Sequence, residues 1–268
     1  PFGVYKVPPI REHIGGSFGE GTELVIGLEK GRFVDEIIES IEEFERKVNS
    51  GEITLEPFVP APNVKNIQIG MLAGGFGSRA EYANASSSKI MHGKKDGSNL
   101  TKGCFRTATG LTPMETSFIS LHKAGYLDCS KGNFGIGKNI KFYLNDSGKN
   151  GGNGSFSVDL YNTMEREGRK SLLILPNDAM SRIPQALKDI NDKINSGDAA
   201  MVMVAKEVKQ KDAIHKLGIM KISPEGLIER FAEKPPVIEE GYADKNGNCF
   251  ANTFQFAVSR EAFEVLNM

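Results

Sequence analysis

The sequence lacks the patterns by which several classes of protein are recognised. Its three cysteines, at 104, 129 and 249, are odd in number and widely spaced, so they predict neither a disulfide framework nor a zinc site and fit a reducing cytoplasm. No apolar run approaches membrane-spanning length, and we recognise no signal peptide. The 33 lysines and arginines are balanced by 34 aspartates and glutamates, which argues against a general nucleic-acid-binding protein. The four histidines are scattered, and we find no Ser-His-Asp arrangement.

The first 65 residues predict an extension that precedes the main domain. Between residues 34 and 48, apolar side chains fall on one helical face and glutamates and lysines on the other, which is typical of an amphipathic helix of about four turns. We expect this helix to pack against the main domain or a partner, with its acidic face solvated. Prolines at 57, 60 and 62 indicate an extended linker, so we place the domain boundary near residue 65.

The main domain, expected over residues 66–268, alternates strands and helices, which predicts an α/β fold. The chain begins with Pro1 and stops where a helix is under way, so we expect a processed chain or a fragment whose main domain continues past Met268. In the helix at 112–125 we expect Met114 in the core and His122 at the surface. The expected strands are 66–72, 138–144, 171–175, 199–205, a hairpin over 217–233, and 251–259; the other expected helices are 155–167 and 181–194.

A glycine-rich loop follows the apolar strand at 66–72. Glycines 74, 75 and 77 let the backbone take positive φ angles and approach a ligand closely, and amide N–H groups freed in such a loop can form a nest for phosphate. Arg79 and Lys89 bring two cations to the same place. The loop is not a Walker A motif, because no Gly-Lys-Ser/Thr follows, and it lacks the helix and second strand of a dinucleotide-binding unit.

Two further segments that follow predicted strands carry polar groups. Asp178 comes shortly after the apolar strand 171–175, and ligands of open α/β sheets gather at the carboxyl ends of strands. A carboxylate there is well placed to hold Mg²⁺, but the residue taken by itself better fits a cap on the next helix. Gly154 and Ser155 open the helix expected at 155–167, where an anion or a base edge can bind, although this pair also suits plain capping.

The chain resembles the sugar-phosphate nucleotidyltransferases, a family that joins a nucleoside triphosphate to a sugar 1-phosphate and releases pyrophosphate. The resemblance covers about residues 66–268 and implies a three-layer α/β sandwich around a mostly parallel mixed sheet, Rossmann-like and of the nucleotide-diphospho-sugar transferase type. The similar residues are Leu72-Ala73-Gly74-Gly75-x-Gly77-Ser78-Arg79 with Lys89 ten places later, the block 217–235 that ends in Phe231-x-Glu233-Lys234-Pro235, and the strand 251–259.

The resemblance implies a role for each matching residue. The nucleotide would be bound by Leu72, Ala73, Gly74, Gly75, Gly77, Gly154 and Ser155. Phosphate charge would be neutralised by the catalytic cations Arg79 and Lys89, and Mg²⁺ would be held by Asp178. Lys234 would contact the phosphate of the sugar 1-phosphate and Glu233 the sugar, which would lie over Asn252 and Thr253.

The chain departs from the family pattern at several places. Compared with the family, the chain carries an insertion at about residues 91–106, and Asn177 stands where the family usually has glycine. Phe254 stands where the family usually has glycine. Ser259 stands near the position where several members carry a second metal-binding aspartate. The last two departures put the sugar site and full activity in question.

Two alternatives therefore stay open beside a Mg²⁺-dependent enzyme. One is a cytidylyltransferase that acts on another phosphorylated alcohol, against which the Glu233-Lys234-Pro235 block argues. The other is a non-catalytic relative that binds a nucleotide sugar and regulates or scaffolds. We expect a nucleoside triphosphate and a sugar 1-phosphate as partners, no nucleic acid or membrane, and a cytoplasmic location; a homo-oligomer stays open. The sequence identifies neither the base nor the sugar.

Overall fold

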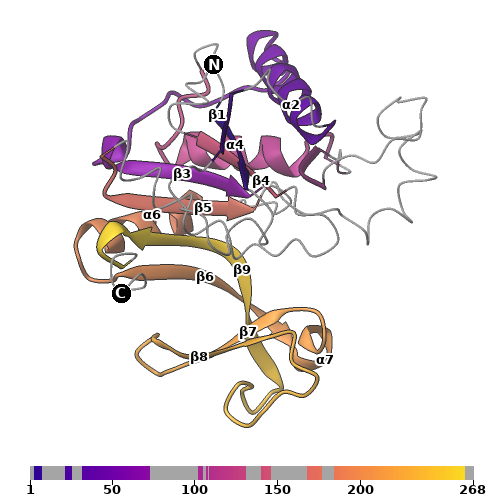
Figure 1. Ribbon diagram of the computed structural model, residues 1–268, viewed down its shortest axis with the longest axis vertical. Coiled ribbons are helices and arrows are strands. Elements are labelled where there is room, and N and C mark those ends of the chain that lie inside the picture. Colours follow the sequence, from indigo (N-terminus) through magenta and orange to yellow (C-terminus); the bar gives the residue numbers. More distant parts are fainter. Residues whose placement is uncertain are drawn as a thin grey trace, which may run out of the picture. The chain divides into compact units, whose positions relative to one another are not determined.

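The structure is a computed structural model, and the residues that it describes are 3–7, 22–25, 32–72, 102–104, 107, 109–130, 140–145, 168–176 and 184–262. The chain divides into two compact units (Figure 1). The larger unit contains Pro1–Met201 and Ala257–Met268, and the smaller unit contains Val202–Phe256.

A sheet of mainly parallel strands forms the centre of the larger unit. Four strands, β1, β4, β3 and β5, are parallel neighbours in that order, and β2 pairs antiparallel with β1. Beyond β5, the order continues with the last residues of β9, where Arg260 N donates to Lys170 O at 2.9 Å. The bounds are β1 Gly3–Val7, β2 Thr22–Val25, β3 Ile67–Leu72, β4 Ile140–Asn145, β5 Ser171–Pro176 and β9 Asn248–Ser259.

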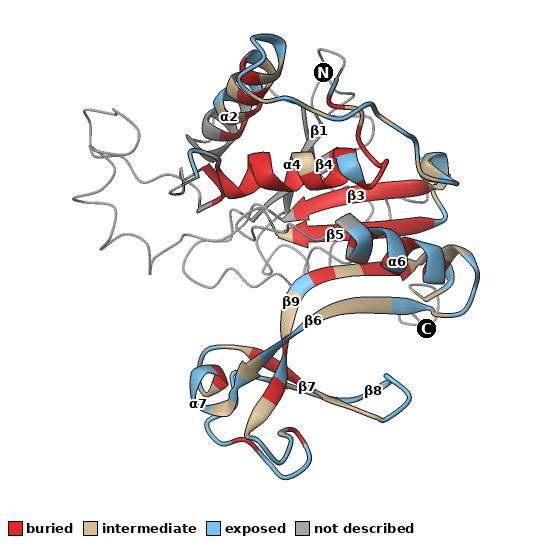
Figure 2. Cartoon of the chain, turned by 180° about the vertical axis from the view of Figure 1, so that it is seen from behind, coloured by how far each residue is buried: buried red, intermediate tan, exposed pale blue. Residues whose placement is uncertain are grey.

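The central strands of this sheet are buried, which is typical of parallel sheets. Residues 171–175 of β5 are buried at every position, as expected for a strand that is covered on both faces. In β3, Ile69 and Met71 are buried, and so is Gln68, whose Nε2 donates to Ile69 O at 2.9 Å. Figure 2 shows both strands as buried along their length. The predicted α/β class with a mostly parallel mixed sheet is confirmed.

Three described helices belong to the larger unit. Helix α4 (Pro113–Lys123) contacts both α2 (Arg32–Asn49) and α6 (Pro184–Asn195), and α6 contacts β5. The short helices are η1 (Val64–Asn66) and η2 (Lys102–Cys104). Helix α4 begins with a capping box, with Thr112 as N-cap, Glu115 at N3 and Pro113 in the first turn. None of the helices in the described part of the chain has the length and apolarity needed to cross a bilayer.

The N-terminal arm, which we define as residues 37–62, lies along α4. The phenyl rings of Phe44 and Phe118 have their centroids 5.3 Å apart. Past the end of α2, the arm continues beside α4, where the His122 ring bonds Glu56 O at 2.8 Å. The expectation that this helix packs against the main domain is thus confirmed. The contacts, ordered along α4, are Lys47 with Glu115, Phe44 with Phe118, Phe58 with His122, and Ala61 with Gly125.

Two side chains that the sequence placed outside the core are buried. His122, expected at the surface, is only 2% exposed, because its Nδ1 accepts from Cys129 N at 3.0 Å while its Nε2 bonds the arm. Because Nδ1 accepts this bond, Nε2 is the ring nitrogen that donates to Glu56 O. Lys47, expected on the solvated face of its helix, is also buried. The surface assignments of both residues are therefore wrong, whereas Met114 is in the core as predicted.

The smaller unit is a set of antiparallel strands with its own core. The hairpin of β7 (Gly218–Ile222) and β8 (Ile228–Glu233), predicted around Gly226, is confirmed, and β9 pairs with the other side of β7. β6 (Met201–Lys209) pairs with β9 and leads into α7 (Gln210–Ala213). The core consists of Ala213, Ile219, Ile238, Tyr242 and Cys249.

Replacing Gly125 with alanine should lower the free energy of unfolding by about 2–4 kcal/mol, because the new Cβ has no room. Gly125 has φ +81°, and a Cβ there would overlap Val59 O and lie 2.5 Å from Ala61 N, both of them backbone atoms of the arm. Gly197 has φ +79° with nothing within 4 Å, so Gly197→Ala should show only the left-handed penalty of about 1 kcal/mol. Urea unfolding of both variants measures the difference, and equal losses would contradict the close docking of the arm.

Candidate functional site

The carboxyl ends of β3, β4 and β5 meet at one edge of the sheet. Leu72, the last residue of β3, is paired with Tyr143 of β4 on one side and with Pro176 of β5 on the other. The chain forms β3 first, then β4 on one side of it, and then crosses to β5 on the other side. The boundary between β3 and β5 is therefore a topological switch point, where open α/β sheets bind ligands.

The predicted nucleotide and metal segments start at this switch point. The glycine-rich loop begins directly after Leu72, and Asn177-Asp178 follows Pro176, which is the sheet neighbour of Leu72. The structure thus brings the starting points of the two predicted segments together. The other residues predicted for the nucleotide half lie outside the described residues, so their contacts stay predictions: Ala73, Gly74, Gly75, Gly77, Arg79, Lys89, Gly154, Ser155 and Asp178.

Glu233 and Lys234, at the end of β8 in the smaller unit, are half-exposed and paired. Lys234 Nζ lies 3.2 Å from Glu233 Oε1, with about half of each side chain exposed to solvent (51% and 49%). The backbone of Lys234 is left-handed (φ 45°), and its N–H donates to Leu217 O at 3.2 Å. Such a conformation costs of order 1 kcal/mol or more in a non-glycine residue and is frequent at functional sites. The pair therefore presents a fixed cation and carboxylate that a ligand can reach.

Gly218 makes room for the Glu233 side chain. The two residues are partners in the β7–β8 ladder, and a Cβ on Gly218 would lie 2.6 Å from both Glu233 Oε2 and the tip of the Phe231 ring. A side chain at position 218 would therefore displace the carboxylate or the ring. Sequence analysis included Gly218 in the matching block but missed this steric role. A lone glycine at the start of a strand was the only signal, and it does not reveal which side chains fold over it.

Asn252 and Thr253 of β9 belong to the same sheet. Ile219 is paired with Ala251, and this antiparallel register, continued by one residue, sets Asn252 beside Gly218. Glu233 and Asn252 therefore flank Gly218 from the two neighbouring strands, about 10 Å apart at the backbone. The smaller unit thus brings the predicted sugar-phosphate residues to one end of β7.

Side-chain oxygens of Asn252 and Thr253 hold an irregular turn in β9. Asn252 Oδ1 accepts from Phe254 N at 2.7 Å. Thr253 Oγ1 donates to Val204 O at 2.6 Å and accepts from Gln255 N at 3.4 Å. Phe254, in the middle, has φ 57°, the left-handed conformation that glycine adopts without strain. The residue that replaces the family's glycine therefore keeps a glycine-like backbone.

Ser259 lies at the opposite edge of the larger unit's sheet. Its N–H donates to Ala200 O, and the next residue, Arg260, bonds Lys170, which directly precedes β5. Ser259 is therefore near the amino end of β5, a strand of six residues, or about 20 Å, from the switch point at its carboxyl end. A side chain at this position is therefore too far from the switch point to bind a metal ion there. The identity of residue 259 therefore gives no evidence for or against metal binding at the switch point.

Other site chemistries find little support in the described part of the chain. All three cysteines are buried and form no disulfide, and burial raises the pKa of the Cys129 and Cys249 thiols, so neither offers a thiolate nucleophile at neutral pH. Among the residues that the structure describes, no group of three His, Cys, Asp or Glu side chains could hold a metal ion. The exposed Asp244 has a lowered pKa because it accepts bonds from Asn248 and Asn246 in its own turn.

The fold is that of the nucleotide-diphospho-sugar transferases, as comparison with solved structures shows. The crystal structure of mannose-1-phosphate geranyltransferase from Thermus thermophilus matches with a TM-score of 0.51 and 17% identity, over 75% of this chain and 59% of that chain. The chain thus spans less than two thirds of that relative. CMP:2-keto-3-deoxy-manno-octonic acid synthetase complexed with CTP matches with a TM-score of 0.46 and 10% identity, over 75% and 77% of the two chains.

The second half of the chain is similar to a known protein family. Residues 129–261 match the family described as Nucleotidyl transferase. The resemblance predicted from the motifs is thereby confirmed. The matched region contains Gly154, Asp178 and the Glu233-Lys234 pair, and it begins after the glycine-rich loop. No curated protein matches the sequence.

Replacing Phe254 will test its left-handed backbone. Phe254→Gly should be about 1 kcal/mol more stable than Phe254→Ala, because alanine is strained at this φ and glycine is not. Phe250 is also exposed and lies on the same strand without a positive φ, so there the order should reverse, with Phe250→Ala more stable than Phe250→Gly. Thermal unfolding of the four variants gives the comparison. If glycine is the less stable substitution at both positions, the backbone assignment at Phe254 is wrong.

Proposed function

We propose that the protein is a nucleotidyltransferase that joins a nucleoside triphosphate to a sugar 1-phosphate, with release of pyrophosphate. The observation that carries this proposal is the pairing of Leu72 with Pro176, because it brings the starts of the glycine-rich loop and the Asn177-Asp178 segment together at a switch point. The nucleotidyl transferase family of residues 129–261 supports the reaction class. The exposed Glu233-Lys234 pair supports a phosphorylated sugar as the second substrate.

In the proposed reaction, an oxygen of the sugar phosphate attacks the α-phosphorus of the nucleotide in line with the departing pyrophosphate. Such chemistry needs positioning and charge neutralisation more than a covalent catalyst. Backbone amides of residues 74–77 would hold the nucleotide, while Arg79 and Lys89 would neutralise its phosphates. Asp178 supplies the carboxylate oxygen that Mg²⁺ prefers, and the bound ion would neutralise charge on the phosphates.

The second substrate would be bound by the residues around Gly218. Lys234 is a half-exposed cation with a left-handed backbone, and such a cation suits the phosphate of a sugar 1-phosphate. The Glu233 carboxylate beside it can accept hydrogen bonds from sugar hydroxyls. Asn252 Oδ1 and Thr253 Oγ1 already form hydrogen bonds with the backbone. These two residues would therefore line the sugar site, while Glu233 and Lys234 would make the main polar contacts with the substrate.

A non-catalytic relative that binds a nucleotide sugar is the second candidate, and Phe254 is the observation that favours it. Its ring is 38% exposed at a position where the family usually has no side chain, so it would narrow the sugar site. Its glycine-like backbone argues the other way, because the turn itself is kept. Nucleotide binding without pyrophosphate release would identify this candidate.

The direct test is pyrophosphate release from ATP, UTP, dTTP, GTP and CTP, each against a panel of sugar 1-phosphates with Mg²⁺. We expect release with one nucleotide–sugar pair, which would also name both substrates. Arg79→Ala should reduce the turnover by roughly 100-fold or more while leaving thermal unfolding unchanged, because it removes a cation that acts mainly on developing charge. Unchanged turnover in this variant would remove Arg79 from the proposed mechanism, and no release from folded wild-type protein would refute the enzyme.

Lys234→Met should raise the KM for the sugar 1-phosphate by about tenfold or more and leave the KM for the nucleotide nearly unchanged, because a charge-assisted contact to phosphate is lost. The exposed Lys245 of the same unit provides the matched control, and Lys245→Met should leave both constants unchanged. Steady-state kinetics with the substrate pair found above measures both effects. A rise in the nucleotide KM alone would place Lys234 in the other half of the site.

A further inference from the structure

One face of the smaller unit's sheet carries exposed aromatic side chains. Met220 of β7 is paired with Phe231 of β8 on one side and with Phe250 of β9 on the other, and paired residues point to the same face. The opposite face, with Ile219 and Ala232, packs in the core of the unit. Phe231 and Phe250 are 47% and 41% exposed, whereas Met220 between them is buried. The aromatic face is therefore open to solvent.

The residues predicted for the sugar phosphate share this face. Gly218 and its ladder partner Glu233 lie two residues away from Met220 and Phe231 on their strands. Because side chains alternate along a strand, the Glu233 carboxylate and the Phe231 ring project from the same face. A Cβ on Gly218 would lie 2.6 Å from Glu233 Oε2 and also 2.6 Å from Phe231 Cζ. The carboxylate and the ring tip therefore lie next to each other above Gly218.

Exposed phenylalanines are confined to the smaller unit in the described part of the chain. They are Phe231, Phe250 and Phe254. Apolar side chains that gather on an exposed surface commonly mark a binding site. Phe231 differs from the other two, because its Cζ and Cε2 are among the three atoms nearest to the Cβ position of Gly218, and the third is Glu233 Oε2. Phe231 is thus the exposed ring that lies against the carboxylate.

A sugar 1-phosphate carries the three kinds of group that these side chains suit. Its phosphate is an anion, its hydroxyls donate hydrogen bonds, and one face of its pyranose ring consists of C–H groups. Lys234 Nζ lies 3.2 Å from Glu233 Oε1, so the cation, the carboxylate and the phenyl ring follow one another along the end of β8. Sites for small molecules commonly combine an apolar wall with a few polar groups that fix the orientation of the ligand.

We propose that Phe231 is a specificity-determining residue for the sugar 1-phosphate, an inference that rests on the proposed function. Its ring packs against the C–H face of the pyranose, while Glu233 accepts from a hydroxyl and Lys234 binds the phosphate. The negative face of the phenyl π-system favours the weakly positive C–H hydrogens. An axial hydroxyl on the stacked side would hold the sugar away from the ring. Phe231 therefore discriminates between sugars that differ in the configuration at one carbon.

The experiment compares Phe231→Leu with a matched control in the full chain. Phe231→Leu removes the aromatic face but keeps an apolar side chain beside Met220. Phe250→Leu is the control, because Phe250 is exposed on the same face but lines a hollow with Ile222 and Asn248 at the other end of β7. Steady-state kinetics uses the nucleotide–sugar pair found above and the epimers of that sugar 1-phosphate. Thermal unfolding gives the folded fraction of each variant.

We expect Phe231→Leu to raise the KM for the sugar 1-phosphate about fivefold and to leave the nucleotide KM nearly unchanged, because a stacking contact is lost. The preference for the natural sugar over epimers with an axial hydroxyl should shrink. Phe250→Leu should match the wild type in both respects. If Phe231→Leu keeps the wild-type KM and epimer preference, or if Phe250→Leu changes them equally, the proposal is overturned.

Nuclear magnetic resonance separates this proposal from the proposed function. The sugar 1-phosphates are added to protein with isotope-labelled phenylalanine, with and without Mg²⁺ and the α,β-methylene analogue of each nucleotide. Nuclear Overhauser effects should join the Phe231 ring, identified by its loss in Phe231→Leu, to C–H protons of one sugar. These contacts without pyrophosphate release would refute the enzyme and keep the sugar contact. Release without them would overturn the role of Phe231 alone, and the absence of both would refute both proposals.

Discussion

The pairing of β3 on both sides is the constraint on which the larger unit depends. β3 is buried and is paired with β4 on one side and β5 on the other, so the ends of all three strands are in register. That register, and not the conformation of any loop, decides that the segments after Leu72 and Pro176 leave the sheet side by side. Because the chain crosses from one flank of β3 to the other, the boundary between β3 and β5 is a switch point, where open α/β sheets bind ligands.

Much of this arrangement could be predicted from the sequence, because its signals are local. The apolar run of β5, the capping box at Thr112 and the hairpin around Gly226 each depend on residues close together in the chain. Long-range contacts carried no such signal. β1 was not predicted, because it is only five residues long and its partner β4 is more than 130 positions away in the sequence. His122 and Lys47 were assigned to the surface because nothing in their own helices reveals the partners that satisfy them.

In the candidate site, too, features set by neighbouring residues could be predicted from the sequence, whereas features set by contacts between distant residues could not. The motif around Glu233 and Lys234 was recognisable, but the role of Gly218 depends on which side chains fold over it from another strand. Phe254 was read as a departure from a glycine pattern, and in residue type it is one. In backbone conformation it is not, because Asn252 Oδ1 holds the amide of Phe254 in a left-handed turn. The family pattern shows glycine because glycine adopts a left-handed turn without strain. A side-chain hydrogen bond to the backbone can stabilise the same turn in another residue, at some cost in backbone strain.

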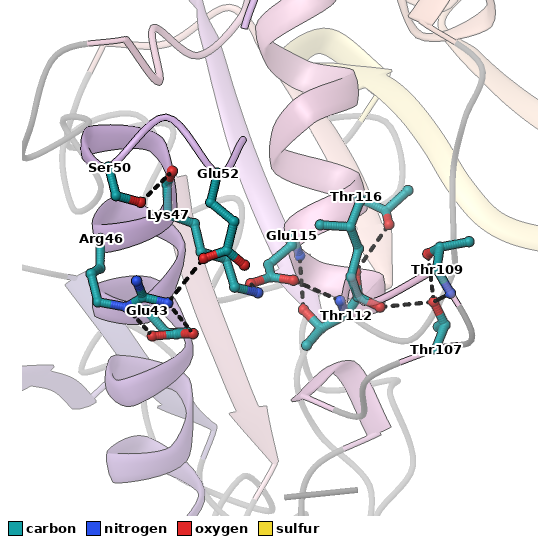
Figure 3. A network of polar contacts seen from close by, with 11 residues as sticks. Glu43, Arg46, Lys47, Ser50, Glu52, Thr107, Thr109, Thr112, Glu115 and Thr116 are labelled. Carbon is teal, nitrogen blue, oxygen red and sulfur yellow. Dashed lines mark hydrogen bonds and ion pairs between the residues drawn. The ribbon is translucent and has the colours of Figure 1, made fainter. Parts of the chain in front are cut away.

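The buried ion pair between Lys47 and Glu115 shows that the N-terminal arm is packed into the larger unit and is not merely attached to it (Figure 3). Removing either partner of an ion pair whose side chains are both 1% exposed would leave a buried charge without its counterpart, so this pair stabilises the contact between α2 and α4. The arm then reinforces the contact along the rest of α4, where the close approach to Gly125 excludes any side chain. Since Glu115 also caps α4, a change at Lys47 reaches the turn before the helix through one carboxylate. The arm and the parallel sheet therefore belong to one compact unit, in which the buried ion pair and the close approach at Gly125 hold the arm against α4.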